Sequence, residues 1–263
     1  MTSPETHTAP DPHVHAHAAP EAYAGVHAQE PDLASLAALL ADRTRASFCI
    51  ALLDGRAWTA TELGRLAGVA PSTATSHLNR LVAGGLLTEE RRGRHRHVRL
   101  ADPGIAEMIE ALAARAPRRP VPVRSLAAAR RHRAVAFARV CYDHLGGALS
   151  VALTDAMTER GYLGWEFGPS LTPSGTAWLA DLGVAGETTP HVRTCVDWTE
   201  RRLHLAGAVA AGVFHHALAR SWLVPAEGSR VVRLTERGRA AFRLHLGLTD
   251  EALTVGWDRS AFS

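Results

Sequence analysis

The stretch VAPSTATSHLNRLVAGGLLTEERRGRHRHVRL, residues 69–100, decides the fold of the first half of the chain. Pro71 stands where a helix begins well, and apolar residues recur at helical spacing until two glycines end the pattern. Two short β-prone segments follow, at about 87–91 and 95–100, on either side of Gly93. The stretch therefore predicts a helix followed by a β-hairpin.

A shorter helix is expected directly before this stretch. In the sequence TATE, Thr59 and Glu62 have the spacing of a capping box, which opens a helix that ends near Ala67. Gly68 then allows a tight turn into the next helix. Two helices joined by a short glycine-containing turn, with a hairpin after the second, predict a winged helix-turn-helix.

The distribution of charge favours a nucleic-acid partner for this part of the chain. All 29 basic residues are arginine. Residues 43–139 hold 18 arginines against seven acids, whereas residues 1–42 hold no arginine and six acids. A basic run by itself is more often solvated surface, but beside a helix-turn-helix it indicates a wing that contacts phosphates. We expect these contacts from Arg91, Arg92, Arg94 and Arg96.

Three sequence blocks in order carry a resemblance to a known family. ADRTRASFCIALLDG, VAPSTATSHLNRLVAGGLL and RRGRHRHVRL resemble the second helix, the recognition helix and the wing of the ArsR/SmtB winged-helix repressors, over residues 32–115. The resemblance implies a homodimer on a palindromic operator, released by an inducer. Its dimer interface would fall on residues 33–40 and 105–112. On this sequence the expected DNA contacts of the recognition helix are Ser72, Thr73, Thr75, Ser76 and Arg80.

The sequence departs from this family at three places. Ala70 stands where a capping side chain is usual, so the start of the recognition helix should be weaker. The helix at 60–67 lacks the cysteine pair of one familiar metal site, and the helix at 102–115 lacks the paired ligands of the other. The resemblance therefore does not identify the inducer.

The second half of the chain contains an internal repeat. HLGGALSVALTDAMTERGYL from His144 aligns without a gap with HLAGAVAAGVFHHALARSWL from His204, and LTPSGTAWL from Leu171 matches LTERGRAAF from Leu234. A Cys-x-Asp triplet precedes each copy, CYD and CVD. Each copy is expected to hold a helix opened by His-Leu, a short hairpin and a second helix.

The repeated polar residues allow two interpretations. As structural residues, the aspartates would cap helices while the cysteines and histidines fill a polar seam. As functional residues, they would form a transition-metal site, for zinc or nickel, or a thiol sensor. The set comprises Cys141, Asp143, His144, Cys195, Asp197 and His204.

The sequence as a whole predicts a mainly α protein with small β-hairpins (α+β) that regulates transcription. No enzyme motif is present, and the chain has neither a signal pattern nor a long apolar run, so a cytoplasmic, non-catalytic repressor is expected. The alternative is a metal- or thiol-responsive binding protein that acts mainly through its C-terminal half. The expected parts are a disordered His-rich tail (1–30), the DNA-binding domain (31–115), a Pro/Arg linker (116–124), the duplicated sensor domain (125–250) and a tail (251–263).

Overall fold

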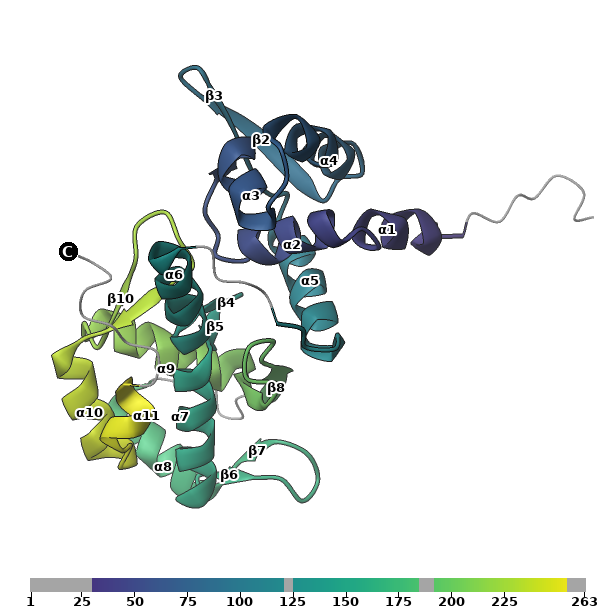
Figure 1. The fold of residues 1–263 in the computed structure, drawn as a ribbon. Helices are drawn as coiled ribbons and strands as arrows, with labels where there is room; N and C mark the ends of the chain where they lie inside the picture. Colours follow the sequence, from purple (N-terminus) through teal and green to yellow (C-terminus); the bar gives the residue numbers. More distant parts are fainter. Residues whose placement is uncertain (1–29, 121–124, 185–191, 255–263) are drawn as a thin grey trace, which may run out of the picture.

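The computed structural model describes residues 30–120, 125–184 and 192–254. Its elements form two groups, one up to α5 and one from α6 onward (Figure 1). Most of the predicted tails (1–29 and 255–263, with the histidine-rich stretch at residues 13–17) and linker residues 121–124 lie outside the described residues. The predicted C-terminal tail, 251–263, is wrong at its start, because residues 251–254 belong to a helix, Asp250–Thr254. The first group consists of α1 (Leu33–Leu40), α2 (Arg43–Leu52), β1 (Trp58–Thr59), α3 (Ala60–Ala67), α4 (Pro71–Ala83), β2 (Leu87–Arg92), β3 (His95–Leu100) and α5 (Pro103–Arg115).

The first group is a winged helix-turn-helix, as the sequence predicts. Helices α3 and α4 meet at Gly68, which adopts a left-handed conformation (φ 74°) that a side chain would strain. Strands β2 and β3 form an antiparallel hairpin with Gly93 at its tip, and β1 adds to the outer edge of β3. Phe48, Leu63 and Leu78 are among the fully buried side chains that hold the helices against this sheet.

The caps of these helices follow the sequence closely. Asp42 accepts hydrogen bonds from the first turn of α2, and Thr59 and Glu62 form the expected capping box on α3. Ala70 provides no side-chain cap to α4, so the helix relies on Pro71 at its first turn. The recognition helix is therefore the one helix of the helix-turn-helix pair that begins without a side-chain cap.

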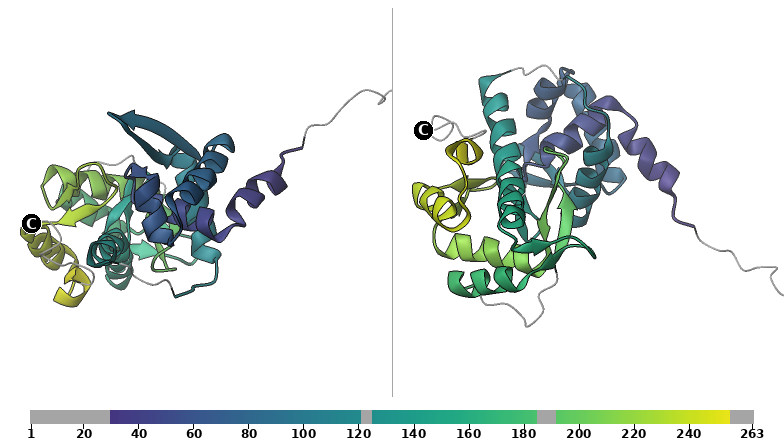
Figure 2. Two further views of the ribbon diagram at one scale, coloured as in Figure 1. Left: turned by 45° about the horizontal axis from the view of Figure 1, so that its top comes forward. Right: turned by 90° about the horizontal axis from the view of Figure 1, so that it is seen from below.

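The second group begins with α6 and then repeats one order of elements twice. Each copy reads strand, strand, helix, strand, strand, helix, and the two copies share one core that includes Leu149, Trp222 and Phe242 (Figure 2). Its elements are α6 (Leu126–Phe137), β4 (Arg139–Cys141), β5 (His144–Gly146), α7 (Ala148–Glu159), β6 (Leu163–Gly164), β7 (Ser170–Leu171), α8 (Pro173–Leu182), β8 (Arg193–Val196), β9 (Leu203–Ala206), α9 (Gly207–Ala219), β10 (Leu223–Pro225), β11 (Val232–Leu234), α10 (Glu236–Leu246) and α11 (Asp250–Thr254).

One expectation about the repeat is wrong. His144 and His204 do not open helices; they lie on β5 and β9, the second strands of two hairpins. Gly147 separates the first of these strands from α7, and a Cβ there would lie 2.6 Å from the carbonyl oxygen of Phe137. The chain must stay extended up to this close approach before the helix can begin.

Some of the contacts between the two groups are hydrogen bonds between turns. The backbone N–H of Arg230 donates to the carbonyl of Asp54 (2.8 Å), and the hydroxyl of Ser229 donates to the same oxygen (2.9 Å). Arg118 donates to the carbonyl of Thr199 (2.6 Å). The C-terminal repeat is thus attached directly to the end of α2. Among the described helices, none combines the length and apolar character needed to cross a bilayer.

Candidate functional site

The recognition helix α4 presents a polar face to solvent. Ser72, Thr73, Ser76 and Arg80 are exposed, while the opposite face enters the core. Thr75 is half-buried, and its hydroxyl donates back to the carbonyl of Pro71 (2.9 Å). Four of the five predicted α4 contacts are therefore directly available to a groove, and Thr75 is partly engaged in its own helix.

The wing arginines fall into two kinds. Arg91 and Arg94 are exposed on the hairpin. Arg92 pairs with Glu90 (2.6 Å), and Arg96 pairs with Glu89. The paired arginines would have to exchange a carboxylate for a phosphate on binding DNA.

Arg96 also fixes the wing relative to the recognition helix. It is half-buried, and one of its N–H groups donates to the side-chain oxygen of Asn79 on α4 (2.7 Å). The wing lies beside α4 in Figure 1. One continuous surface therefore carries the hydroxyls of α4 and the arginines of the hairpin.

Two large apolar side chains are exposed on the helices of the predicted dimer interface. Leu33 on α1 is 71% exposed and Leu112 on α5 is 51% exposed. Helix α1 has no buried residue; Leu36, Leu39 and Leu40 pack on the winged-helix core, and its N-terminal end points away from the rest of the chain (Figure 1). Single exposed leucines are common on protein surfaces, so the dimer interface on these two helices stays a prediction.

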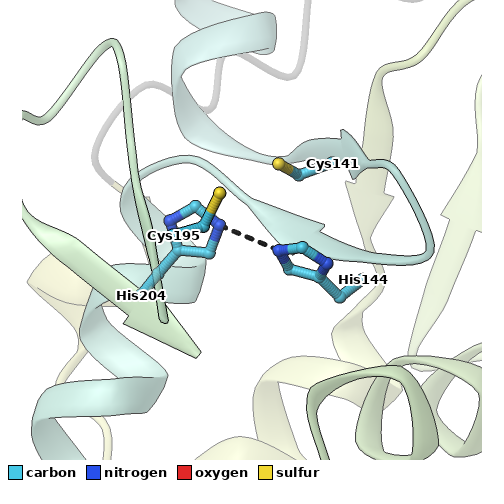
Figure 3. A group of neighbouring side chains, drawn as sticks. All are labelled: Cys141, His144, Cys195 and His204. Atoms are coloured by element: carbon cyan, nitrogen blue, oxygen red, sulfur yellow. Dashed lines mark hydrogen bonds between the residues drawn. The ribbon is translucent and has the colours of Figure 1, made fainter. Parts of the chain in front are cut away.

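The polar residues of the repeat gather at one point. Cys141, His144, Cys195 and His204 each direct one ligand atom into a common space, and these four atoms all lie within 4.8 Å of one another (Figure 3). Cys141 is paired across β4–β5 with His144, and Cys195 is paired across β8–β9 with His204. Each hairpin therefore contributes one thiol and one imidazole.

The two imidazoles face each other through Nε2, at 3.2 Å. On the far side of one ring, His144 Nδ1 lies 3.0 Å from a carboxylate oxygen of Asp143. On the far side of the other, His204 Nδ1 has no hydrogen-bond partner among the described residues, and Asp197 is 3.8 Å away. Cys141, His144 and His204 are buried, and Cys195 is half-buried, so Cys195 forms the outer edge of the cluster.

The four members of the cluster differ in the direction in which their surroundings shift their pKa values. Hydrogen bonds from Cys141 and His144 lower the pKa of Cys195 to about 4, against the effect of burial. The hydrogen bond to Cys195 and burial together raise the pKa of Cys141. Burial lowers the pKa of His204 to about 4. Burial would also lower the pKa of His144, but Cys195 and Asp143 outweigh it and raise this pKa. The lowered pKa of Cys195 favours its thiolate form, which is a good electron-pair donor.

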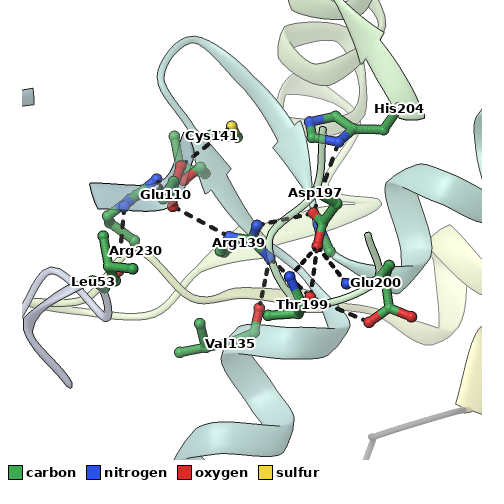
Figure 4. Close-up of polar contacts among 12 residues, drawn as sticks. Leu53, Glu110, Val135, Arg139, Cys141, Asp197, Thr199, Glu200, His204 and Arg230 are labelled. Carbon is green, nitrogen blue, oxygen red and sulfur yellow. Dashed lines mark hydrogen bonds and ion pairs between the residues drawn. The ribbon is translucent and has the colours of Figure 1, made fainter. Parts of the chain in front are cut away.

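Asp197 is fully buried beside the cluster and binds several donors (Figure 4). It accepts hydrogen bonds from the N–H of Gly147 (2.6 Å), from Thr199, from the N–H of Glu200 (3.0 Å) and from Arg139 (2.9 Å). Although burial opposes it, Arg139 and these hydrogen bonds lower the pKa of Asp197 to about 2. Gly147 is the N-cap residue of α7, so Asp197 of the second copy supports the helix of the first.

The expectation that Asp143 and Asp197 cap the helices that follow them is therefore wrong. Neither α7 nor α9 has a side-chain cap hydrogen bond from its own copy. Asp143 instead contacts the ring of His144, and Asp197 binds the N-cap residue of the other copy's helix.

A third group of residues, which the sequence analysis missed, joins the cluster to the winged helix. Glu110 on α5 is buried, and one carboxylate oxygen accepts from the Cys141 thiol (Sγ···Oε2 3.8 Å). The other oxygen faces Arg230 (3.0 Å) and the fully buried Arg139 (3.6 Å) (Figure 4). The available signal was weak: Glu110 lies four residues from Ala106 and from Ala114, on the apolar side of α5.

The chain is similar in sequence to known transcriptional regulators. Residues 40–90 match a family described as "Helix-turn-helix domain". The "Uncharacterized HTH-type transcriptional regulator YdfF" of Bacillus subtilis (strain 168) is 36% identical over 224 residues, which are 83% of this chain and 98% of that protein. The chain belongs to the HTH-type transcriptional regulators. It is a transcriptional regulator with a winged helix-turn-helix DNA-binding domain and an additional C-terminal region, as the sequence predicts.

The solved structures that match part of this chain include two regulators. The cadmium metal-sensor CMTR of Mycobacterium tuberculosis is 30% identical, with 35% of this chain and 99% of that chain covered and a TM-score of 0.28. The transcriptional repressor BigR of Xylella fastidiosa is 22% identical, with 33% and 88% covered and a TM-score of 0.30.

Proposed function

We propose that this HTH-type regulator is a dimeric repressor that binds a palindromic operator and is released by an inducer acting through the C-terminal repeat. The observation that carries the proposal is the continuous surface of α4 and the wing. Its exposed hydroxyls suit base edges in the major groove, and its arginines suit the flanking phosphates. We expect it to work in the cytoplasm and without catalysis.

Dimerisation follows from the size of this surface. One recognition helix spans too few base pairs for useful specificity, and two half-sites about 34–36 Å apart require a protein with two-fold symmetry. The exposed Leu33 and Leu112 lie on α1 and α5, the two helices of the predicted interface. Release by an inducer requires a ligand that binds the two states of the dimer unequally. The C-terminal repeat is the region that α5 and the turn after α2 contact directly.

The test is fluorescence anisotropy with the promoter DNA of the protein's own operon. We expect specific binding that exceeds binding to random DNA by at least about 10³-fold, as is typical of sequence-specific regulators. Equal affinity for both duplexes would contradict the proposal. Repeating the titration with a chelator and with peroxide separates release by metal from release by oxidation.

A second candidate function is favoured by the Cys/His cluster. The chain could serve mainly as a metal- or thiol-responsive binding protein whose DNA contact is secondary. Absence of any operator preference, together with ligand binding at the cluster, would support this candidate instead.

A further inference from the structure

We propose that Cys141, His144, Cys195 and His204 form a tetrahedral site for a thiophilic divalent cation of the zinc class, and that Glu110 on α5 transmits its occupancy to the DNA-binding domain. The second part rests on the proposed function. The first part stands on the cluster alone.

The spacing of the ligand atoms fits such an ion. With zinc–nitrogen bonds of about 2.0 Å and zinc–sulfur bonds of about 2.3 Å, the edges of a tetrahedron are roughly 3.3 Å between nitrogens and 3.8 Å between sulfurs. The two Nε2 atoms are 3.2 Å apart, and the four ligand atoms lie within 4.8 Å of one another. A small contraction around an ion would complete the geometry.

The hydrogen bonds around the histidines select Nε2 as the ligand atom. With an ion bound, His144 Nδ1–H would donate to Asp143, and Nε2 would present its lone pair to the ion. The same tautomer in His204 would direct its Nδ1–H toward Asp197, which is 3.8 Å away. Without an ion, one of the two Nε2 atoms carries the proton of the 3.2 Å hydrogen bond, and an ion between the rings would replace this proton and bind both lone pairs. Carboxylates behind the ligating imidazoles are the usual outer shell of a zinc site.

The donor set decides the class of ion. Two thiols and two imidazoles favour zinc in tetrahedral geometry over calcium or magnesium, which prefer oxygen ligands. A divalent ion balanced by two thiolates leaves no net charge in the buried space. The half-buried Cys195 provides the side from which an ion can enter. Four protein ligands close the site, so the ion would bind the two hairpins together without an open position for catalysis.

Occupancy must change the contact between Cys141 and α5. In the metal-free protein the single S–H of Cys141 faces both the Cys195 sulfur and the carboxylate of Glu110, to which it donates a hydrogen bond. Binding of the ion forms a sulfur–metal bond, breaks the S–H bond and releases the proton to solvent, so the sulfur loses its donor. Two electron-rich atoms, the metal-bound sulfur and the carboxylate oxygen, would then face each other. Glu110 is expected to shift toward Arg230 and carry α5 with it.

The site is tested with cobalt(II) on the full-length, reduced protein under argon. Because residues 1–29 contain several histidines, the background carries His13→Ala, His15→Ala and His17→Ala. We expect one equivalent of cobalt to give the strong visible bands of tetrahedral geometry and a near-ultraviolet thiolate-to-cobalt band, and zinc to remove both. The thiolate band reports only ions bound by cysteine. A square-planar nickel spectrum with a weak cobalt signal would overturn the tetrahedral assignment.

Matched variants locate the signal. Cys195→Ser should weaken cobalt binding by at least about 100-fold, since loss of an outer-shell partner alone weakens a site by 10- to 100-fold. Cys49→Ala, in the winged-helix core, and His215→Ala, on the surface of α9, should leave the spectrum unchanged. If Cys195→Ser does not fold, cadmium-113 NMR of the unsubstituted protein provides the same test. One resonance typical of two sulfur and two nitrogen ligands is expected, and no such resonance overturns the site.

Two further outcomes also overturn the site. Absence of a thiolate band with one equivalent of cobalt shows that the cluster is a hydrogen-bonded polar seam. A Cys141–Cys195 disulfide, found by peptide mapping, as the only change that alters DNA binding shows a thiol switch instead.

The transmission step is tested separately with Glu110→Gln. An amide can accept from the thiol through its oxygen and donate to the thiolate through its nitrogen, so the contact persists in both states. We expect zinc to weaken operator binding of the unsubstituted protein by about 5- to 150-fold, the usual range of allosteric coupling, and to have little effect on Glu110→Gln. The variant should keep the cobalt spectrum. If zinc weakens both proteins equally, Glu110 does not transmit the signal.

The three possible failures are distinguishable. Failure of the proposed function appears as absence of operator preference in the metal-free protein. Failure of the site appears in the cobalt spectrum, which needs no DNA. Failure of transmission appears as unchanged operator affinity in a protein that binds both DNA and zinc.

Discussion

Arg94→Ala should change how the affinity for DNA depends on salt. Arg94 is exposed near the tip of the wing, directly after Gly93, and neither Glu89 nor Glu90 pairs with it in the way that they pair with Arg96 and Arg92. Its guanidinium is therefore available to a phosphate without first leaving a carboxylate. Because each phosphate contact releases counterions, its loss lowers the salt dependence of binding.

The magnitude follows from the number of contacts. Each lost phosphate contact changes the slope of log K against log salt by about 0.9, so a dimer that loses two contacts changes by about 1.8. Between about 50 and 200 mM salt this slope corresponds to roughly a 12-fold difference. The ratio of unsubstituted to Arg94→Ala affinity should thus be about 12 times larger at the lower salt concentration.

The assay is fluorescence anisotropy over a series of salt concentrations, with operator and random duplexes in parallel. Both duplexes should show the same change in slope, since phosphates carry no sequence information. Arg202→Ala is the matched control, because Arg202 is an exposed arginine of the C-terminal repeat that pairs with Asp155. An unchanged slope for Arg94→Ala would refute the assignment of the wing to the DNA backbone.

Three other predictions concern readout, assembly and stability. Ser76→Ala should reduce operator preference by about 1–3 kcal/mol with little change on random DNA, as measured by competition; equal loss on both would show that Ser76 does not read bases. Light scattering at micromolar concentration should give a dimeric mass that Leu112→Arg lowers toward the monomer, and a monomeric unsubstituted protein would contradict the interface. Arg139→Met should lower the free energy of unfolding by about 3 kcal/mol, the lower end for a broken buried ion pair, because Asp197 keeps its other donors. If urea unfolding shows that the free energy of unfolding falls by less than about 1 kcal/mol, Arg139 is not needed to balance the charges of Asp197 and Glu110.

The winged helix could be predicted because its signals are local. Caps at Asp42 and Thr59, the turn at Gly68 and the alternation in β3 each lie within a few residues of the structure that they determine. Even the missing cap at Ala70 was visible. In such segments the sequence pattern and the final structure agree.

The cluster could be predicted only in part. Repetition of Cys-x-Asp and of His-Leu indicated the right residues, but HLGGALS resembles the start of an apolar helix. The strand at His144 is only three residues long, too short to show the alternating pattern of a β-strand. Its pairing with β4 therefore could not be predicted. The partnership of Glu110, Arg139 and Arg230 joins residues far apart in the chain, so no local pattern encodes it.

The cross-strand pairing of each cysteine with its histidine has an evolutionary consequence. Two residues separate Cys141 from His144, whereas eight separate Cys195 from His204, yet both pairs stand opposite each other on their hairpins. The turn between the strands can therefore lengthen freely, while a shift of one strand by a single residue would direct a histidine to the other face. Relatives that share this arrangement should differ in the lengths of these turns and keep the pairing. A search for a fixed spacing between cysteine and histidine would miss half of the cluster within this single chain.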